Sequence, residues 1–485
     1  MKKSRILSLL LAALMLSTPL YACSDDGEQT SDDSAAADTT VAETEPDPLA
    51  DPFPEDLKYN GYNFRFYGDI GDTFVLCTIY RAEEKGETVN DAVFNRNKQI
   101  EERFDVKLTH VQSASDVYGV YKDVGPIIQS GDDFCDIICG ENMKQLYTQN
   151  ALVNLREVEA FDFSKPWWMP AADSLTVNNK LYTIQSAIAY NMLAYARVIY
   201  ANADLAKANN IEFPYDAIRE GKWYLDDWIK MTKDFYKDVN GNGTRDWNDT
   251  YGMAMVGAQW TTTECFGVES VIMNEQKTAL IDNVMSPEFQ TYMDKTCAWL
   301  FGGNPGFSYR TSGKTGEALM DMFVNGTLLS MMNFMQNPIK IIDTINFEYT
   351  ILPVPKLDEN QKDYQVASTG NNFAVPTTIK DKERTGTIIE AMSRLGYIDV
   401  FPAYKDLALR GRYSTNQDCA DMIDIICDHI YISFANHCIP SNPQQFYREV
   451  WADQNPIPEI ASKYAAKKSV YAQDIAAMNE HFFGK

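Results

Sequence analysis

The chain has 485 residues, of which 45% are hydrophobic and 12% aromatic, and this is ample for a large core shared by two lobes of ordinary domain size. Its formal net charge is -25. Because no tract of Lys and Arg interrupts this acidic balance, the composition argues against binding to nucleic acid or to an anionic membrane surface.

The N-terminus has the pattern of an export signal. Three of the first five residues are basic and precede an apolar run, residues 6–16, which is too short to span a membrane comfortably. Cys23 follows the small residue Ala22 and precedes a long polar stretch, which predicts cleavage before Cys23 and attachment of lipid to its thiol. We therefore expect residues 1–22 to be a signal peptide and the mature protein to be anchored on the extracellular face of the cell membrane; plain secretion is the alternative.

An acidic segment follows the lipidation site. Residues 24–57 contain twelve Asp and Glu and no Lys or Arg. Such a segment buries too little apolar surface to offset the loss of chain entropy, and its charges repel one another. We expect residues 23–57 to be the lipidated cysteine and a disordered, extended stalk.

The folded part opens with alternating strands and helices. A strand is predicted over residues 62–67, where aromatic and polar residues alternate, and a helix from about residue 91. A second strand, a second helix and a third, doubly buried strand follow over 106–111, about 114–130 and 134–139.

This order is typical of a parallel sheet, in which ligands bind beyond the carboxyl ends of the strands. The first predicted strand is followed by Asp69, and the third by Glu141 and Asn142. We therefore predict that these three side chains contact a ligand.

The nine cysteines do not form local disulfides. Cys135 and Cys139 are about 13 Å apart along a predicted strand, and Cys419 and Cys427 about 12 Å apart along a predicted helix. Apart from Cys23, we predict buried thiols; long-range disulfides are the alternative.

No convincing catalytic set is present. The four histidines lie outside metal-spaced and Ser/Asp-flanked motifs, and no phosphate loop or dinucleotide fingerprint occurs. Asp69 and Glu141 remain as a conceivable carboxylate pair for glycoside hydrolysis. The sequence therefore favours a binding protein over an enzyme.

Several sequence blocks, in a fixed order, carry a resemblance to a known family. They include NDAVFNRNKQIEERFDVKL at 90–108, GKWYLDDWIKMTKDF at 221–235, DMFVNGTLLSMMNF at 321–334, FEYTILPVPKLDE at 347–359 and STGNNFAVPTTIKDKERTGTIIEAM at 368–392. From about residue 58 to its end, the chain resembles the extracellular solute-binding proteins of ABC importers, of the maltose-binding-like type.

The resemblance implies an α/β, two-lobed periplasmic-binding-protein-like fold of type II. Each lobe would be a mostly parallel sheet flanked by helices, and hinge crossings would join the lobes. Residues 58–165 and 368–410 would form lobe 1, and residues 166–367 and 411–485 lobe 2. The resemblance further implies a monomer that works with the transmembrane subunits of an ABC permease.

The segment from Asp238 to Asp249 has the spacing of an EF-hand-like calcium loop, with glycine at position 6. The candidate ligands are Asp238, Asn240, Asn242, Thr244 (through its backbone carbonyl), Asp246 and Asp249. Asn at positions 3 and 5 and Asp at position 12 predict weak affinity, which suits millimolar calcium outside a cell. The alternative is a plain Asn/Gly/Asp turn.

Aromatic residues point to a carbohydrate ligand, because sugars combine apolar faces with hydroxyl rims. From the resemblance and from the ends of strands we predict further ligand contacts at Trp167, Trp168, Trp260, Asn333, Phe334, Thr369, Asn371 and Asn372. Weaker candidates are Tyr190, Asn191, Arg410 and Arg412, and the alternative for the two arginines is a surface or interlobe salt bridge. Trp223, Trp228 and the methionines of residues 331–335 are instead predicted to lie in the core.

Together these features predict a lipid-anchored, non-enzymatic receptor. It would capture a carbohydrate or oligosaccharide by hinge closure and deliver it to an ABC permease, with structural calcium as the one expected cofactor. The first alternative is a receptor for a peptide or polyamine, because a positively charged ligand could pair with Asp69 and Glu141. The others are a surface glycoside hydrolase or lyase and a calcium-stabilised adhesion module.

Overall fold

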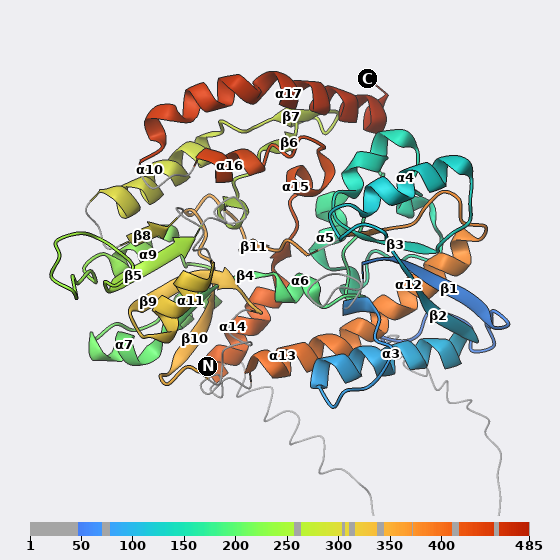
Figure 1. Cartoon of the computed structure of the whole chain (residues 1–485), viewed down its shortest axis with the longest axis horizontal. Helices are drawn as coiled ribbons and strands as arrows, with labels where there is room; N and C mark the ends of the chain where they lie inside the picture. Colours follow the sequence, from blue (N-terminus) through green and yellow to red (C-terminus); the bar gives the residue numbers. More distant parts are fainter. Residues whose placement is uncertain are drawn as a thin grey trace, which may run out of the picture. The chain divides into compact units, whose positions relative to one another are not determined.

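The computed structural model describes residues 47–69, 78–256, 263–302, 306–309, 316–336, 344–370, 372–409, 417–450 and 455–484. The chain divides into a unit of residues 1–48 and a compact unit from Leu49 to Lys485, and every element below belongs to the second unit (Figure 1). Cys23, the signal peptide and most of the predicted stalk lie outside the described residues, as do Trp260, Asn371, Arg410 and Arg412.

The first sheet has four strands in the order β12-β3-β1-β2. They are β1 (Tyr62–Gly68), β2 (Val106–Gln112), β3 (Ile137–Gly140) and β12 (Asn372–Ala374). β1 pairs in parallel with β2 and β3, as predicted, and β12 is antiparallel to β3. Two helices connect the parallel strands of this sheet. α3 (Thr88–Phe104) begins slightly earlier than predicted, and α4 (Val120–Ser130) begins later than predicted because a loop precedes it.

The second sheet has five strands in the order β10-β4-β9-β5-β8. They are β4 (Arg197–Asn202), β5 (Tyr251–Val256), β8 (Gly306–Tyr309), β9 (Leu328–Phe334) and β10 (Tyr349–Pro353). β4 is antiparallel to β10 and β9, whereas β9, β5 and β8 are parallel to one another. One strand in each sheet therefore runs against the others, and both sheets are mostly parallel.

Helices flank both sheets. α12 (Lys382–Leu395), a π-helical turn η7 (Gly396–Val400) and α13 (Phe401–Leu409) pack against α3, and α14 (Gln417–Asp428) packs against β10 (Figure 1). The other α-helices are α5 (Met169–Leu175), α6 (Asn191–Ala194), α7 (Ala203–Ala208), α8 (Tyr215–Arg219), α9 (Leu225–Thr232), α10 (Pro287–Phe301), α11 (Gly316–Val324), α15 (Phe434–Cys438), α16 (Gln445–Val450) and α17 (Ile457–Phe483). Short 3-10 turns are η1 (Met143–Gln149), η2 (Leu155–Glu157), η3 (Pro166–Trp168) and η5 (Thr263–Phe266).

Two small sheets complete the fold. β6 (Val271–Met273) and β7 (Leu280–Asp282) form an antiparallel pair, and β11 (Val366–Ala367) pairs in parallel with β13 (Ile430–Tyr431). The chain crosses between the two large sheets three times: between β3 and β4, between β10 and β12, and between α13 and α14. None of the helices in the described part of the chain has the length and apolar composition needed to span a membrane.

The core contains the residues predicted for it. Trp223 and Trp228 are buried, and their indole N–H groups donate to the carbonyl of Pro353 at 3.1 Å and to Ser330 Oγ at 3.0 Å. The methionines of residues 331–335 are buried as well. Seven cysteines of the described chain are buried and form no disulfide, as predicted.

The predicted stalk, residues 23–57, extends too far toward the C-terminus. Asp51 forms an ion pair with Arg103 at 2.9 Å, and Phe53 packs edge-on against Phe104 with 6.0 Å between ring centroids. Arg103 also donates to four backbone carbonyls between residues 53 and 57. Residues 51–57 therefore pack on α3, because Arg103 pairs with Asp51 and donates to backbone carbonyls of this segment.

The C-terminal region differs from expectation in one place. The amphipathic pattern of residues 418–434 predicts one helix, but α14 ends at Asp428, and β13 and α15 follow. α15 and the end of α17 also reach lobe 1: Lys144 Nζ donates to the carbonyl of Asn436 at 2.6 Å, and the rings of Tyr147 and Phe482 lie 6.5 Å apart. The predicted assignment of residues 411–485 to lobe 2 therefore omits contacts with lobe 1.

Candidate functional site

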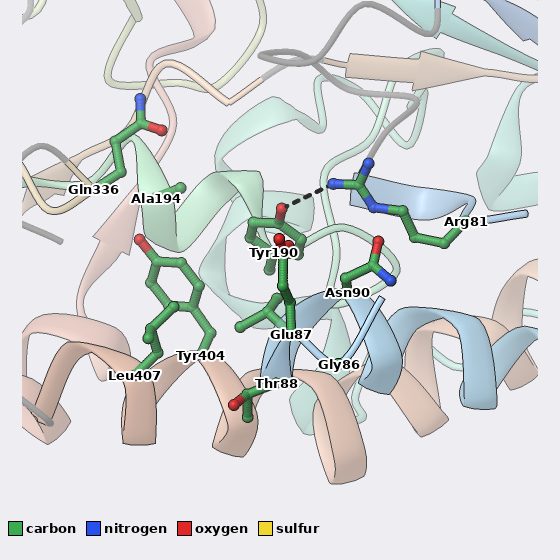
Figure 2. Close-up of a pocket in the computed structure, with 11 residues that line it drawn as sticks. Arg81, Gly86, Glu87, Thr88, Asn90, Tyr190, Ala194, Gln336, Tyr404 and Leu407 are labelled. Carbon is green, nitrogen blue, oxygen red and sulfur yellow. Dashed lines mark hydrogen bonds between the residues drawn. The ribbon is translucent and has the colours of Figure 1, made fainter. Parts of the chain in front are cut away.

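A cavity of about 560 Å³ lies around the start of α3 and is also lined by Gln336, which follows a strand of the second sheet (Figure 2). Its walls are the loop that leads into α3, the first turn of α3, α6, the residue after the end of β9, and α13. This volume falls within the range of small-molecule sites. We call it the interlobe cavity, and it is the candidate ligand site.

A buried arginine holds two of the cavity-lining segments in place. Arg96, in α3, is fully buried and donates to the carbonyls of Ile188, at 2.7 Å, and Ile79, and to Asn97 Oδ1 at 2.9 Å. Desolvation lowers the pKa of Arg96 to about 9, against a smaller opposing effect of Asp399. Carbonyl oxygens thus replace water around this guanidinium.

The two anchored carbonyls lie two residues before two polar groups of the cavity. Arg81 follows Ile79, and Tyr190 follows Ile188. Arg81 Nη2 donates to the hydroxyl of Tyr190 at 3.5 Å, as the dashed line in Figure 2 shows. Arg96 therefore positions Arg81 and Tyr190 through their backbones.

A pair of tyrosines forms one side of the cavity. The rings of Tyr190 and Tyr404 are stacked, with 5.4 Å between centroids and an interplanar angle of 24°. Tyr404 is 3% exposed, its hydroxyl has no hydrogen-bond partner within the described part of the chain, and burial raises its pKa well above the usual value. The pair offers an apolar ring face beside phenol groups that can donate to a ligand.

The second sheet contributes Gln336, two residues beyond β9. The end of β9 itself is largely engaged within the protein. The guanidinium of Arg197 lies 3.5 Å from the ring centroid of Phe334, and Asn333 is 5% exposed with its amide nitrogen 3.1 Å from Met320 Sδ. The predicted ligand contacts of Phe334 and Asn333 do not line the cavity, because a cation covers the ring and burial removes the amide from solvent.

The side chains at the ends of β1 and β3 lie elsewhere. Asp69 is half-buried and accepts from Gln112 Nε2 at 3.2 Å. Burial raises the pKa of Glu141 to about 7, with Lys144 opposing the rise. Asn142 adopts a left-handed backbone conformation (φ 58°) and donates to the carbonyl of Tyr118 at 3.2 Å. None of these three residues lines the interlobe cavity.

Asn372 and Thr369 belong to a buried polar region at the second crossing. Asn372 is 2% exposed; its Nδ2 lies 2.9 Å from His437 Nδ1, and its Oδ1 accepts from Gln185 Nε2 at 3.1 Å. Burial lowers the pKa of His437 to about 3, so this imidazole is neutral. Thr369 is half-buried. The predicted contact of Asn372 does not line the cavity, because side chains of the protein already occupy its amide.

Trp167 and Trp168 were predicted as ligand contacts and lie in the core. Both are fully buried, and their indole N–H groups donate to Glu390 Oε1 and Oε2, each at 2.9 Å. With no surface open to a cleft, neither ring can stack on a ligand in this conformation.

The predicted calcium loop has part of the required geometry. Both carboxylate oxygens of Asp238 accept backbone N–H groups, from Gly241 at 2.6 Å and Gly243 at 2.9 Å. Asn240 and Asn242 both approach Asp246 Oδ2, at 3.4 and 2.9 Å. The side chains at positions 3, 5 and 9 of the loop therefore converge.

The twelfth position fits less well. Asp249 is fully buried, and its carboxylate accepts from the Tyr236 hydroxyl at 3.0 Å and from the amides of Val239 and Asp246 at 3.1 and 3.2 Å. Within the described residues, no group of three or more His, Cys, Asp or Glu is placed to hold a metal ion. A calcium ion here would thus need amide and carbonyl oxygens of Asn and Thr in addition to carboxylates.

Of the predicted ligand contacts, Tyr190 alone lines the cavity, within the part of the chain that the structure describes. Arg81, Gln336 and Tyr404 were missed. Gln336 could have been found, because it follows a strand of a mostly parallel sheet at its carboxyl end. No local pattern distinguishes Arg81 or Tyr404 from other surface and helical residues.

Comparison with solved structures shows which known proteins have a similar fold. The chain matches no protein-family model and no curated protein. It is similar to the galacto-N-biose-/lacto-N-biose I-binding protein of an ABC transporter from Bifidobacterium longum, solved with lacto-N-biose, with a TM-score of 0.55, 11% identity, and coverage of 86% of this chain and 99% of that one.

Two further solved structures agree. A sugar transporter from Rhizobium etli in an open conformation has a TM-score of 0.53 at 12% identity, over 87% of this chain and 99% of that one. The GacH receptor of Streptomyces glaucescens, solved unliganded and with acarbose, has a TM-score of 0.51 at 11% identity, over 85% and 99%. Sequence blocks, sheet topology and these likenesses agree that the chain has the two-lobed fold of the sugar-binding proteins of ABC transporters.

Proposed function

We propose that the protein is the substrate-binding component of an ABC importer and captures a carbohydrate between its lobes. The observation that carries the proposal is the interlobe cavity, where a stacked tyrosine pair lies beside polar side chains. This combination suits the apolar face and hydroxyl rim of a sugar ring. Proteins of the same fold are described as binding lacto-N-biose and acarbose, which supports a carbohydrate over a peptide or polyamine.

The proposed mechanism is a shift between open and closed forms. Arg81 and Tyr190 are held to α3 of the first sheet, whereas Gln336 follows a strand of the second. A ligand that contacts both groups binds the closed form more tightly and so raises its population. The closed form would then be recognised by the transmembrane subunits of a permease.

We further propose that the mature protein is a monomer tethered to the extracellular face of the cell membrane by lipid on Cys23. The support is the export signal and the acidic segment that follows it. The function proposed is binding without catalysis, as in the binding proteins of the same fold.

We also propose a structural calcium ion in the loop from Asp238 to Asp249. Asp238, Asn240, Asn242, Asp246 and Asp249 and the carbonyl of Thr244 would hold it. The support is the convergence of the side chains at positions 3, 5 and 9 and the EF-hand-like spacing. The ion would tie this loop together and take no part in ligand binding.

A thermal-shift screen tests the function. The purified protein is heated with mono- and oligosaccharides, peptides, amino acids and polyamines, and a ligand that binds the folded state raises the midpoint. We expect shifts with one class of glycan, unchanged glycan after prolonged incubation, and loss of the shift in Tyr190→Ala and Gln336→Ala. Tyr118→Ala is the matched control, since Tyr118 is 53% exposed and outside the cavity.

Other outcomes of the screen would point to other functions. Shifts with polyamines or peptides alone would overturn the carbohydrate assignment. Glycan products in the incubation would indicate a glycoside-active enzyme. Binding to polymers without any change in the separation of the lobes, measured by small-angle X-ray scattering, would indicate an adhesion module.

A further inference from the structure

Arg81 lines the interlobe cavity, and its guanidinium has few partners. Within the described residues, its Nε is buried and has no hydrogen-bond partner, and its Nη2 makes one long bond, of 3.5 Å, to the hydroxyl of Tyr190. No carboxylate lies within ion-pair distance of Arg81 in the described residues, whereas Arg65 and Arg219 each pair with two or more. Because a buried N–H without a partner is costly, a ligand that supplies acceptors here gains that energy back.

The edge formed by Nε and Nη2 suits one kind of group in particular. Two parallel N–H donors on a planar guanidinium match the two oxygens of a carboxylate, which they can bind as a fork. A neutral sugar hydroxyl uses one of these donors and leaves the other unpaired. The geometry of the donors therefore favours an anionic ligand group.

The start of α3 adds a second source of positive potential. This 17-residue helix begins at Thr88, and its first turn forms part of the cavity wall. The side chain at its N-cap, Glu87, makes no capping hydrogen bond. The positive end of the helix dipole is consequently available to an anion in the cavity.

A third donor comes from α13. Tyr404 is 3% exposed, and among the residues that the structure describes its hydroxyl has no hydrogen-bond partner. Figure 2 shows that this hydroxyl is directed toward Gln336 and Ala194, which also line the cavity. A buried hydroxyl that lacks a partner indicates a group that a ligand is meant to satisfy.

The acidic groups close to the cavity do not cancel the positive potential of Arg81 and the start of α3. Glu87 lines the cavity and, in Figure 2, is directed toward Tyr190, but its side chain is exposed, so water and salt screen its charge. Asp91 lies in the first turn of α3, but its Oδ1 accepts the amide of Lys85 at 2.8 Å and Asn90 Nδ2 at 3.1 Å. The carboxylate of Asp91 is thus engaged by the loop that precedes α3.

We propose that the interlobe cavity binds a carbohydrate that carries a carboxylate, of the uronic-acid class, and that Arg81 pairs with this carboxylate. The start of α3 and the hydroxyl of Tyr404 complete the anion site. The inference rests on the proposed capture of carbohydrate and narrows its substrate class. It also explains why an arginine with open donors lies beside a stacked tyrosine pair.

The test compares an acidic oligosaccharide with its neutral counterpart of equal length. Binding of trigalacturonate and of galactotriose to the purified protein is measured by isothermal titration calorimetry. We expect trigalacturonate to bind about tenfold to a hundredfold more tightly, which is the range for hydrogen bonds to a charged group. Its affinity falls with added salt, because the pair is electrostatic, whereas any affinity for galactotriose does not.

Substitutions assign the effect to the residue. Arg81→Gln is expected to remove the preference for the acid, and Arg81→Lys to restore part of it, since a lysine keeps the charge without the fork. Tyr404→Phe is expected to weaken trigalacturonate by a smaller factor. Arg219→Gln is the matched control, because Arg219 pairs with Asp418 and Asp421 outside the cavity. An unchanged thermal midpoint without ligand shows that each variant is folded.

The outcomes separate this inference from the function on which it rests. Equal affinity for both sugars, or an acid preference that survives Arg81→Gln, overturns the role of Arg81 and leaves carbohydrate capture standing. Binding of glucose 6-phosphate but not of trigalacturonate overturns the carboxylate and keeps an anion site. If the protein binds none of these probes and no other glycan, both proposals are contradicted.

Discussion

Replacing Glu390 by glutamine should change how the stability of the protein depends on pH. Glu390 lies in α12, is fully buried, and accepts the indole N–H groups of Trp167 and Trp168 on its two oxygens. Desolvation raises its pKa to about 8, although the two indoles oppose the rise. The folded protein therefore keeps a proton on this group at a pH where the unfolded chain has lost it.

The size of the effect follows from this difference. A pKa that rises from its ordinary value of 4.5 to about 8 corresponds to at most about 5 kcal/mol, at about 1.4 kcal/mol per tenfold change in proton affinity. Because the folded-state pKa is the higher one, this stability is fully present below pH 4.5 and is lost as the pH rises through about 8. Glu390→Gln removes the titration and sets an amide nitrogen against one indole N–H, at a cost of about 1–3 kcal/mol.

Urea unfolding followed by tryptophan fluorescence at several pH values measures both quantities. We expect Glu390→Gln to be less stable than the parent at pH 5 by about 1–3 kcal/mol, and the difference to shrink or reverse by pH 8.5. Trp168→Phe, which removes one donor and keeps the carboxyl, should retain the pH dependence. A difference between parent and Glu390→Gln that stays constant from pH 5 to pH 8.5 would refute the reasoning.

Three further outcomes are expected. Gly396→Ala should destabilise the protein by about 3 kcal/mol in urea unfolding, because its Cβ would overlap the carbonyl of Ala187, whereas Gly125→Ala, whose Cβ would meet Leu146 Cδ2 at 3.5 Å, should be neutral or slightly stabilising. Millimolar calcium, unlike equal magnesium, should raise the thermal midpoint, and Asp246→Ala should abolish this rise; an equal rise in the variant would exclude the loop as the site. The seven buried thiols should react with iodoacetamide only after unfolding, and labelling of the native protein, located by mass spectrometry, would contradict their burial.

The order of elements was predictable, because it depends on local patterns. The alternation of Phe64 and Phe66 with polar residues marks β1. The amphipathic spacing of residues 457–483 predicts one long helix there, and α17 spans these residues. Bounds were wrong where a side chain distant in sequence decides them. Arg103 folds residues 51–57 onto α3, although the composition of that segment is typical of disorder.

The candidate site was predictable in part only. Tyr190 was identified, but Trp167 and Trp168 were placed in the cleft because tandem tryptophans suit stacking on sugars. Their indoles instead meet Glu390, more than 200 residues further along the chain. No local pattern shows which aromatic ring will find such a partner, nor that Arg81 and Tyr404 will line one cavity.

The anchoring of the cavity by Arg96 has a consequence for how a ligand enters and leaves. Arg81, Tyr190 and the start of α3 are tied to the first sheet, and Tyr404 stacks on Tyr190, whereas the second sheet supplies Gln336. A ligand would find most of its partners already assembled before the lobes close, and closure would add few contacts. Since a ligand shifts an equilibrium only by its difference in affinity for the two forms, closure should be shallow and ligand exchange rapid. Such a receptor would favour fast turnover at the transporter over long retention of its cargo.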